Sequence, residues 1–338
     1  MIKLYDKNMK YIKSFTSYKD LKITEELKTG YKVAQFSVPY SIASIQEEQK
    51  IEINGYLYVI KEVNMEDEEF YSVYAKPYFS SLVNKSIDNY SRYGITFSEV
   101  MNSLLAETDW TFRGNALGAF TVNIQNKTLL EALSFVSELY NCYFIYQTKE
   151  KVIEVIDKNV DKDLKATFTI TPSKLRSCQV QSNTYDLVTR LIPIGKDQIT
   201  IQNVNGNCLY LDNHQYTDEI IVGYYVDGHC ANADDLMITA KAKLDEISKP
   251  RTTYKIQISE FNTELKIGDK IRIINDIKKI DEELYIKKTV LFPETIEESY
   301  IELGAEMVSF DDIYKEFKDI QDSINKDTLR NLTELNKI

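Results

Sequence analysis

The sequence contains few cysteines, glycines and prolines. There are four cysteines, and no two of them form a CxxC motif, which excludes a zinc ribbon and a redox dithiol. They are Cys142, Cys178, Cys208 and Cys230. With 11 glycines and 6 prolines in 338 residues, the composition also excludes a disordered or fibrous chain.

Long apolar runs and excess positive charge are also missing. No run approaches the roughly 18–20 apolar residues that span a bilayer, and the polar start MIKLYDKNMK does not resemble a signal peptide. The formal net charge is −11. Because nucleic acid is bound through clustered Lys and Arg, we expect neither sequence-specific nucleic-acid contacts nor a membrane-spanning segment.

Aromatic residues are abundant, with 24 Tyr and 14 Phe against one Trp, and this composition favours strands. The hydrophobic patterns divide the chain into four parts. These are a first β domain over 1–88 (with strands near 166–200 as candidates to complete it), an α/β insertion domain over 89–165, a second β domain over 166–308 with a helical insertion at 232–248, and a C-terminal helix over 309–338. The sequence therefore predicts a β-rich α+β fold.

Three stretches before residue 300 have the periodicity of helices: Thr96–Thr108, Lys127–Asn141 and Asn232–Ile247. Two of them begin with the spacing of a capping box, in which a threonine is followed three residues later by a glutamate. The pairs are Thr96 with Glu99 and Thr128 with Glu131.

The clearest hairpin joins Lys50–Ile53 to Tyr56–Val63 through Asn54-Gly55, because Asn-Gly supplies the two positive-φ positions of a type I′ turn. A similar pair of stretches, Lys270–Ile273 and Tyr285–Lys288, occurs near the end of the chain. Two interpretations stay open. Hairpins resemble one another by chance, or the chain contains two copies of one small β-barrel.

Residues Tyr185–Ile201, YDLVTRLIPIGKDQITI, form the most informative stretch. The pattern predicts a strand through Leu187 to Ile192, an end near Pro193, and a turn at 195–197 that leads into a second strand. We expect this hairpin to return from the α/β insertion and to join the two β halves. We expect Arg190, Lys196 and Asp197 to fix a turn or an inter-domain ion pair rather than to bind a ligand.

The sequence shows no convincing catalytic constellation. The two histidines, His214 and His229, lack the spacing of metal ligands. Asp227-Gly228-His229-Cys230 places a cysteine beside a histidine, but adjacent strand residues point to opposite faces, which does not suit a nucleophile and its base. We find no P-loop, GxGxxG, HExxH or GxSxG motif. We therefore expect a protein that is not an enzyme, with no metal site and no cofactor.

The last 29 residues have a narrow apolar stripe in heptad spacing, formed by Ile313, Phe317, Ile320 and Ile324. One interpretation places this helix at the axis of a trimer, with the stripe as an oligomer interface. The other packs the stripe against the last β-barrel of its own chain.

The stretch around residue 190 resembles the signature NxVTRLxPxGKDGLTI of tail proteins from long-tailed phages and prophages of Gram-positive bacteria, which include proteins called prophage tail endopeptidases. The matching residues are Val188-Thr189-Arg190-Leu191, Pro193, Gly195-Lys196-Asp197 and Ile199-Thr200-Ile201, and Gln198 replaces the common glycine. Further similarities extend the resemblance over about residues 1–308.

The resemblance implies a baseplate-hub fold with two small β-barrel domains. It implies a homotrimer that closes the distal end of the tail tube, adapts sixfold to threefold symmetry, and contacts the tail tube or distal tail protein and other baseplate or tail-tip proteins. It also implies a location in the virion tail, after assembly in the bacterial cytoplasm. Two alternatives stay open: a tail-associated peptidoglycan endopeptidase and a tail protein that binds the host surface.

Overall fold

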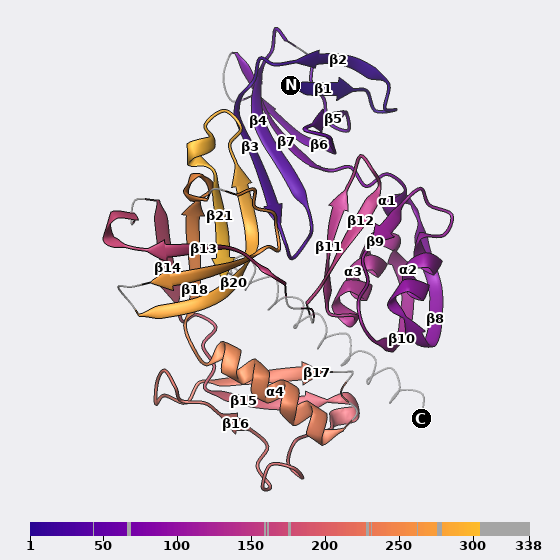
Figure 1. Cartoon of the computed structure of the whole chain (residues 1–338). Coiled ribbons are helices and arrows are strands. Elements are labelled where there is room, and N and C mark those ends of the chain that lie inside the picture. Colours follow the sequence, from indigo (N-terminus) through magenta and orange to yellow (C-terminus); the bar gives the residue numbers. More distant parts are fainter. Residues whose placement is uncertain are drawn as a thin grey trace. The chain divides into compact units, whose positions relative to one another are not determined.

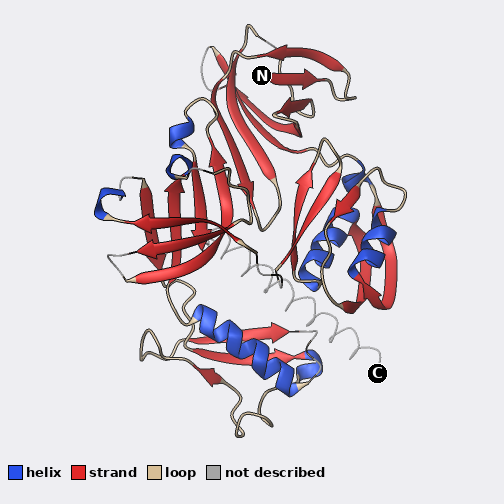
Figure 2. Ribbon diagram, in the orientation of Figure 1, coloured by secondary structure: helices blue, strands red, loops and turns tan. Residues whose placement is uncertain are grey.

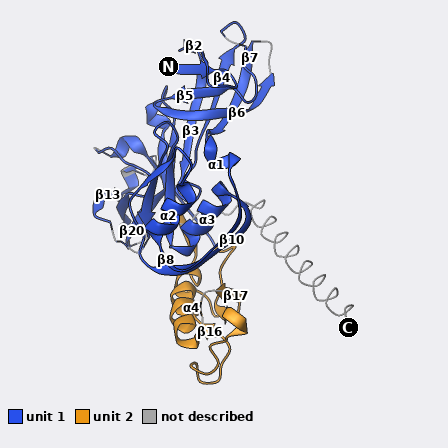
Figure 3. Ribbon diagram, turned by 90° about the vertical axis from the view of Figure 1, so that its right-hand side faces the viewer, with its two compact units in different colours: residues 1–183, 254–304 blue, residues 184–253, 305–338 orange. Residues whose placement is uncertain are grey.

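The computed structural model describes residues 1–304, except for 43, 66–68, 159, 161, 175–176, 228–229, 231, 262 and 276–278 (Figures 1 and 2). Contacts divide the described chain into two compact units (Figure 3). Unit 1 combines Met1–Asn183 with Tyr254–Gly304, and the described part of unit 2 is Thr184–Thr253.

A first set of strands comes from the beginning of the chain. It contains β1 (Ile2–Tyr5), β2 (Tyr11–Phe15), β3 (Lys19–Glu26), β4 (Lys32–Pro39), β5 (Lys50–Ile53), β6 (Tyr56–Met65) and β7 (Phe70–Pro77). The predicted hairpin is confirmed, since β5 pairs antiparallel with β6 and the two turn residues, Asn54 and Gly55, have φ of 50° and 77°. Inward-facing residues such as Ile2, Phe36 and Tyr58 form one core.

A second set of strands lies on either side of unit 2 in the sequence. It contains β13 (Leu164–Ile170), β14 (Cys178–Asn183), β18 (Arg251–Gln257), β19 (Lys270–Asn275), β20 (Ile280–Leu291) and β21 (Tyr300–Gly304). Single 3-10 turns occur at Pro172–Lys174, Ile258–Glu260 and Ile296–Glu298. Phe168, Tyr254 and Ile271 belong to the separate core of this set.

The two sets repeat one strand order. The first runs β1-β5-β6-β7-β4-β3, and the second runs β13-β19-β20-β21-β18-β14. When the strands of each set are numbered from 1 to 6 in chain order, leaving out β2, both sets have the same order across the sheet, 1-4-5-6-3-2. The two sets differ in the direction of one pair, because β1 is antiparallel to β5 whereas β13 is parallel to β19. The similarity of the hairpins in the sequence therefore extends to six strands.

Strand β20 joins the two sets into one 13-stranded sheet, because it pairs with β3 as well as with β19 and β21. The ion pair between Lys288 and Glu26, 3.0 Å, crosses this seam. Leu27, just after β3, is buried in the core of the second set, while Leu291, at the end of β20, packs against the core of the first. Each of the two strands therefore ends against the other set's core.

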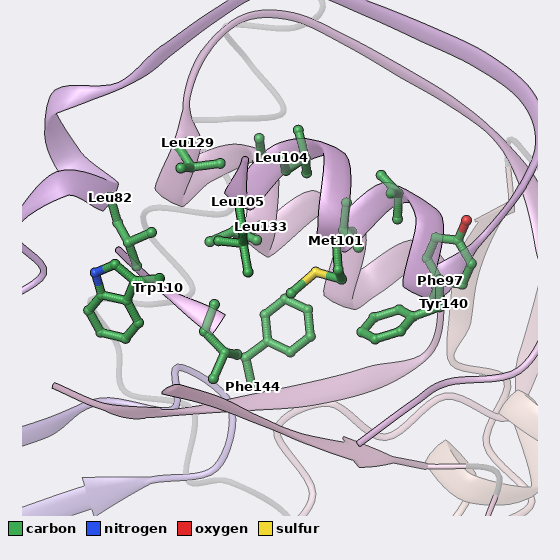
Figure 4. Packing of buried hydrophobic residues seen from close by; sticks show 14 of the residues in the cluster. Leu82, Phe97, Met101, Leu104, Leu105, Trp110, Leu129, Leu133, Tyr140 and Phe144 are labelled. Atoms are coloured by element: carbon green, nitrogen blue, oxygen red, sulfur yellow. The ribbon is translucent and has the colours of Figure 1, made fainter. Parts of the chain in front are cut away.

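An α/β region separates the two strand sets in the sequence. Its helices are α1 (Ser81–Asn84), α2 (Phe97–Leu105) and α3 (Leu129–Leu139), and its strands are β8 (Ser86–Thr96), β9 (Thr111–Arg113), β10 (Ala119–Thr128), β11 (Cys142–Gln147) and β12 (Val152–Asp157). β10 and β8 form a two-stranded ribbon, and β11, β12 and β9 form a three-stranded sheet. Both sheets share one core with the helices, in which Phe97, Leu133 and Phe144 pack together (Figure 4).

The capping boxes predicted for the two longer helices of this region are confirmed. Glu99 accepts a hydrogen bond from the backbone N–H of Thr96 at 2.9 Å, and Glu131 accepts one from Thr128 at 2.7 Å. Both α2 and α3 begin directly after their threonine. Local sequence thus fixes where these helices start.

Unit 2 has two layers, a short sheet and a helix. The sheet has the order β16-β15-β17, with β15 (Arg190–Gly195) between β16 (Leu211–Asp212) and β17 (Val222–Asp227). The third predicted helix is confirmed as α4 (Ala233–Ile247), and the Asn232 side chain caps it by accepting from Asp235 N at 2.8 Å. Leu191, Ala240 and Leu244 form the core between helix and sheet.

The predicted fold class, a β-rich α+β protein with two β domains and an α/β insertion, is confirmed. The predicted domain boundaries stay a prediction, and the C-terminal helix predicted for 309–338 lies outside the described residues. Asn205-Gly206-Asn207 has residues typical of a hairpin turn, but it is a turn with no strand directly on either side.

Two glycines at positive φ provide a matched test of how the first strand set meets the α/β region. A Cβ on Gly30 would lie 1.6 Å from the backbone O of Phe144, whereas a Cβ on Gly55 would meet nothing within 4 Å. Gly30→Ala should lower the free energy of unfolding by about 2–4 kcal/mol through backbone strain and a clash. Gly55→Ala should lower it by about 1 kcal/mol through strain alone. Urea unfolding measures both, and equal losses would contradict the close contact with β11.

Candidate functional site

Strand β15 contains the centre of the signature stretch, and its position differs from the prediction. The strand begins at Arg190 rather than near Leu187, and it includes Pro193 instead of ending there. It pairs in parallel with β17 along its whole length and antiparallel with β16 only at Arg190 and Leu191. The expectation that this stretch joins the two β halves as a strand is therefore wrong, because β15 belongs to the sheet of unit 2.

Pro193 fits inside this strand because of the short length of β16. A proline has no N–H to donate, so it disrupts a strand that is paired on both edges. Beyond Leu191 the edge of β15 that faces β16 is no longer in a ladder, and its next contact is a single bridge between Ile194 and Thr200. The second strand predicted after the turn is therefore reduced to this single β-bridge.

The polar residues of the signature hold unit 2 together. The hydroxyl of Thr189, fully buried, donates to Glu219 O at 2.6 Å and accepts from Ile221 N at 2.8 Å. Arg190 donates two hydrogen bonds to Asp212, at 2.8 and 2.7 Å, and these bonds lower the pKa of that carboxyl. The guanidinium also lies 3.8 Å from the centre of the Tyr210 ring. Arg190 thus forms an ion pair within unit 2 instead of the predicted turn contact or inter-domain ion pair.

The turn after β15 explains the glycines of the signature. A Cβ on Gly195 would lie 2.8 Å from Cys230 O and 3.3 Å from the Leu236 side chain, so only glycine fits there. The following 3-10 turn, Lys196–Gln198, has φ of 54° at Asp197 and 62° at Gln198. The left-handed region favours glycine, and Gln198 stands where the family signature has one.

Cys230 and Asp227, from the cluster that places a cysteine beside a histidine, have structural contacts in unit 2. Cys230 is buried with Ile201 and Leu236, and burial raises the pKa of its thiol, which disfavours the thiolate that a nucleophile needs. Asp227 accepts from the Tyr225 hydroxyl at 3.2 Å, while Gly228 and His229 lie outside the described residues. No group of His, Cys, Asp and Glu in the described parts of the chain could hold a metal ion.

The outer face of the unit 2 sheet is the feature that the sequence analysis missed. Tyr225 of β17 points toward α4, so Val222, Tyr224 and Val226 point the other way, and they are 51%, 69% and 69% exposed. We call these three residues the β17 face. The signal in the sequence was Val222–Asp227, VGYYVD, in which apolar residues occupy both faces of one strand instead of one.

The four residues predicted to form an oligomer interface, Ile313, Phe317, Ile320 and Ile324, lie outside the described residues. Within residues 1–304, as far as they are described, no helix is long and apolar enough to cross a bilayer.

Comparison with known proteins identifies the chain as similar to phage tail proteins. Residues 168–314 match the family "Prophage endopeptidase tail". Prophage tail protein gp18 from Listeria monocytogenes is 14% identical, with a TM-score of 0.65 over 95% of this chain and 99% of that one. The 43 kDa tail protein of prophage MuSo2 from Shewanella oneidensis is 13% identical, with a TM-score of 0.63 over 89% and 97%.

A more distant structural match is the E. coli protein c3393, a type VI secretion component described as similar to the T4 tail proteins gp27 and gp5. It is 12% identical, with a TM-score of 0.50 over 92% of this chain and 77% of that one. No curated protein matches the chain. The resemblance predicted from the signature is confirmed: residues 168–314 match the prophage tail family, and the chain has the fold of solved prophage tail proteins.

Proposed function

We propose that this protein is a structural component of the tail of a phage or a phage-tail-like particle, and that it forms the baseplate hub at the distal end of that tail. The family match and the fold shared with two prophage tail proteins support the tail role. The likeness to a secretion component that itself resembles T4 gp27 and gp5 supports the hub role.

The repeated strand order is the observation that carries this proposal. A homotrimer of a chain with two similar strand sets contains six similar units, and six units can match a sixfold tube while three chains keep threefold symmetry. The repeat covers six strands in each set, far more than one resembling hairpin. On this proposal the hub closes the tail tube, and the strand sets contact the tail tube or distal tail protein.

The remaining partners follow from the same proposal. Other baseplate or tail-tip proteins would bind the parts of the chain that do not face the tube, and assembly would take place in the bacterial cytoplasm. We propose that the protein is not an enzyme, and the buried thiol of Cys230 supports this. The name of the matched family favours one alternative, a tail-associated peptidoglycan endopeptidase.

Mass measurement in solution tests the oligomeric state. We expect about 118 kDa, three times the 39.2 kDa of one chain, measured by light scattering during size exclusion. A protein that stays at 39.2 kDa and is absent from purified tail particles would refute the hub proposal.

Substitution in the C-terminal stripe tests its proposed position at the trimer axis. Phe317→Asp should dissociate the trimer, because a buried carboxylate in an apolar seam is strongly disfavoured. Asn325→Asp adds the same charge one position beyond the stripe and should leave the mass unchanged. If Phe317→Asp keeps the trimer and only lowers thermal stability, the stripe packs on its own chain instead.

A zymogram of the purified chain tests the enzymatic alternative. We expect no clearing of peptidoglycan by residues 1–338, beside a muralytic enzyme loaded in the same gel as positive control. Clearing that Cys230→Ser abolishes would establish the endopeptidase and refute the purely structural role.

A further inference from the structure

Within its described residues, unit 2 leaves a parallel pair of strands uncovered on one side. Strands β15 and β17 are parallel, and α4 covers only the face that contains Leu191 and Tyr225. Parallel sheets normally have both faces buried. Unit 2 also contains eight of the nineteen large apolar side chains that are exposed in the described chain, although it has fewer than a quarter of the residues. The β17 face is therefore expected to be covered by something else.

The charge around the β17 face indicates what could cover it. Residues 211–227 contain four carboxylates and neither lysine nor arginine. Asp212 is paired with Arg190, whereas Asp218 and Glu219, four and three residues before β17, are exposed. An occupant should thus present apolar side chains beside basic ones.

The β8–β10 ribbon of unit 1 has that combination. Tyr93, on β8, is the most exposed of the large apolar side chains described, at 93%. It lies in a β-bulge, where Tyr93 and Gly94 oppose Thr121 alone, and bulges direct side chains out of the regular sheet. Leu117, two residues before β10, is exposed as well. Phe120 lies on the opposite side of the ribbon, where its ring packs against Tyr140 at 5.0 Å. We call Tyr93 and Leu117 the ribbon face.

The ribbon has a small excess of positive charge in an otherwise acidic chain. Strands β8 and β10 contain Arg92 and Lys127 against a single acid, Asp88. Arg92 donates a hydrogen bond to the backbone O of Ser91 at 3.0 Å, and it directly precedes Tyr93 in the chain. Tyrosine and arginine are the side chains that most often dominate the binding energy of interfaces.

We propose that the β17 face of one copy docks against the ribbon face of the next copy. This inference rests on the homotrimer proposed above and names the surfaces that would hold it together. The two surfaces differ, so the contact is head-to-tail, and three such contacts can close a ring. Pairing of the β17 face with itself would bring acidic flanks together, which like charges oppose.

Cross-linking between copies tests the pairing. Tyr93→Cys and Tyr224→Cys are made separately in a Cys208→Ser background, since Cys208 is the one native cysteine that is not buried. The two full-length variants are co-expressed with different tags and treated with a short bismaleimide. Because each chain has only one of the new cysteines, a link between the two tags reports a contact between copies rather than within one.

We expect a covalent product that contains both tags, and no product above background when either variant is expressed alone. Tyr11→Cys, an exposed tyrosine on the edge strand β2, replaces Tyr93→Cys as the matched control and should give no link. A protein of trimer mass that shows no mixed-tag product would overturn the docking while the hub proposal stands. A protein of monomer mass would overturn both.

Discussion

The pairing of β20 with three strands is the constraint on which unit 1 depends. Its first half, residues 280–285, pairs with β19, and its second half pairs with β21 and β3. Leu27, which follows a strand of the first set, is buried in the core of the second set, and Leu291 of the second set packs against the core of the first. Neither strand set therefore completes its packing without the other. A change at this seam should therefore affect both sets, even though each has its own apolar core.

The repeated strand order gives this seam a functional meaning. Two similar sets joined by hydrogen bonds form a rigid pair, and a rigid pair is what a ring of six similar units in three chains would require. A difference between the sets, the parallel pairing of β13 with β19, occurs where the chain enters the second set from the α/β region. The repeat thus keeps the sheet order while the connections differ.

The two proposed docking surfaces lie on the segments that are inserted between the repeated strands. The ribbon face belongs to the α/β region and the β17 face to unit 2, and neither has a counterpart in the strand sets. Apolar side chains on such exposed positions are costly for a chain that works alone. Their opposite charge character makes them suitable partners in an assembly of copies.

The sequence by itself determined the features that depend on neighbouring residues. The Asn54-Gly55 turn and the capping boxes of α2 and α3 follow from local backbone chemistry, and the signature around Arg190 indicated the family that residues 168–314 match. Tertiary structure alone decided which strands pair when they lie far apart in the sequence. Pro193 could remain inside β15 only because β16 is short, and β15 joined a separate sheet because its partners lie some 20 to 35 residues further along the chain. Pairing at such distances depends on packing, which no local pattern encodes.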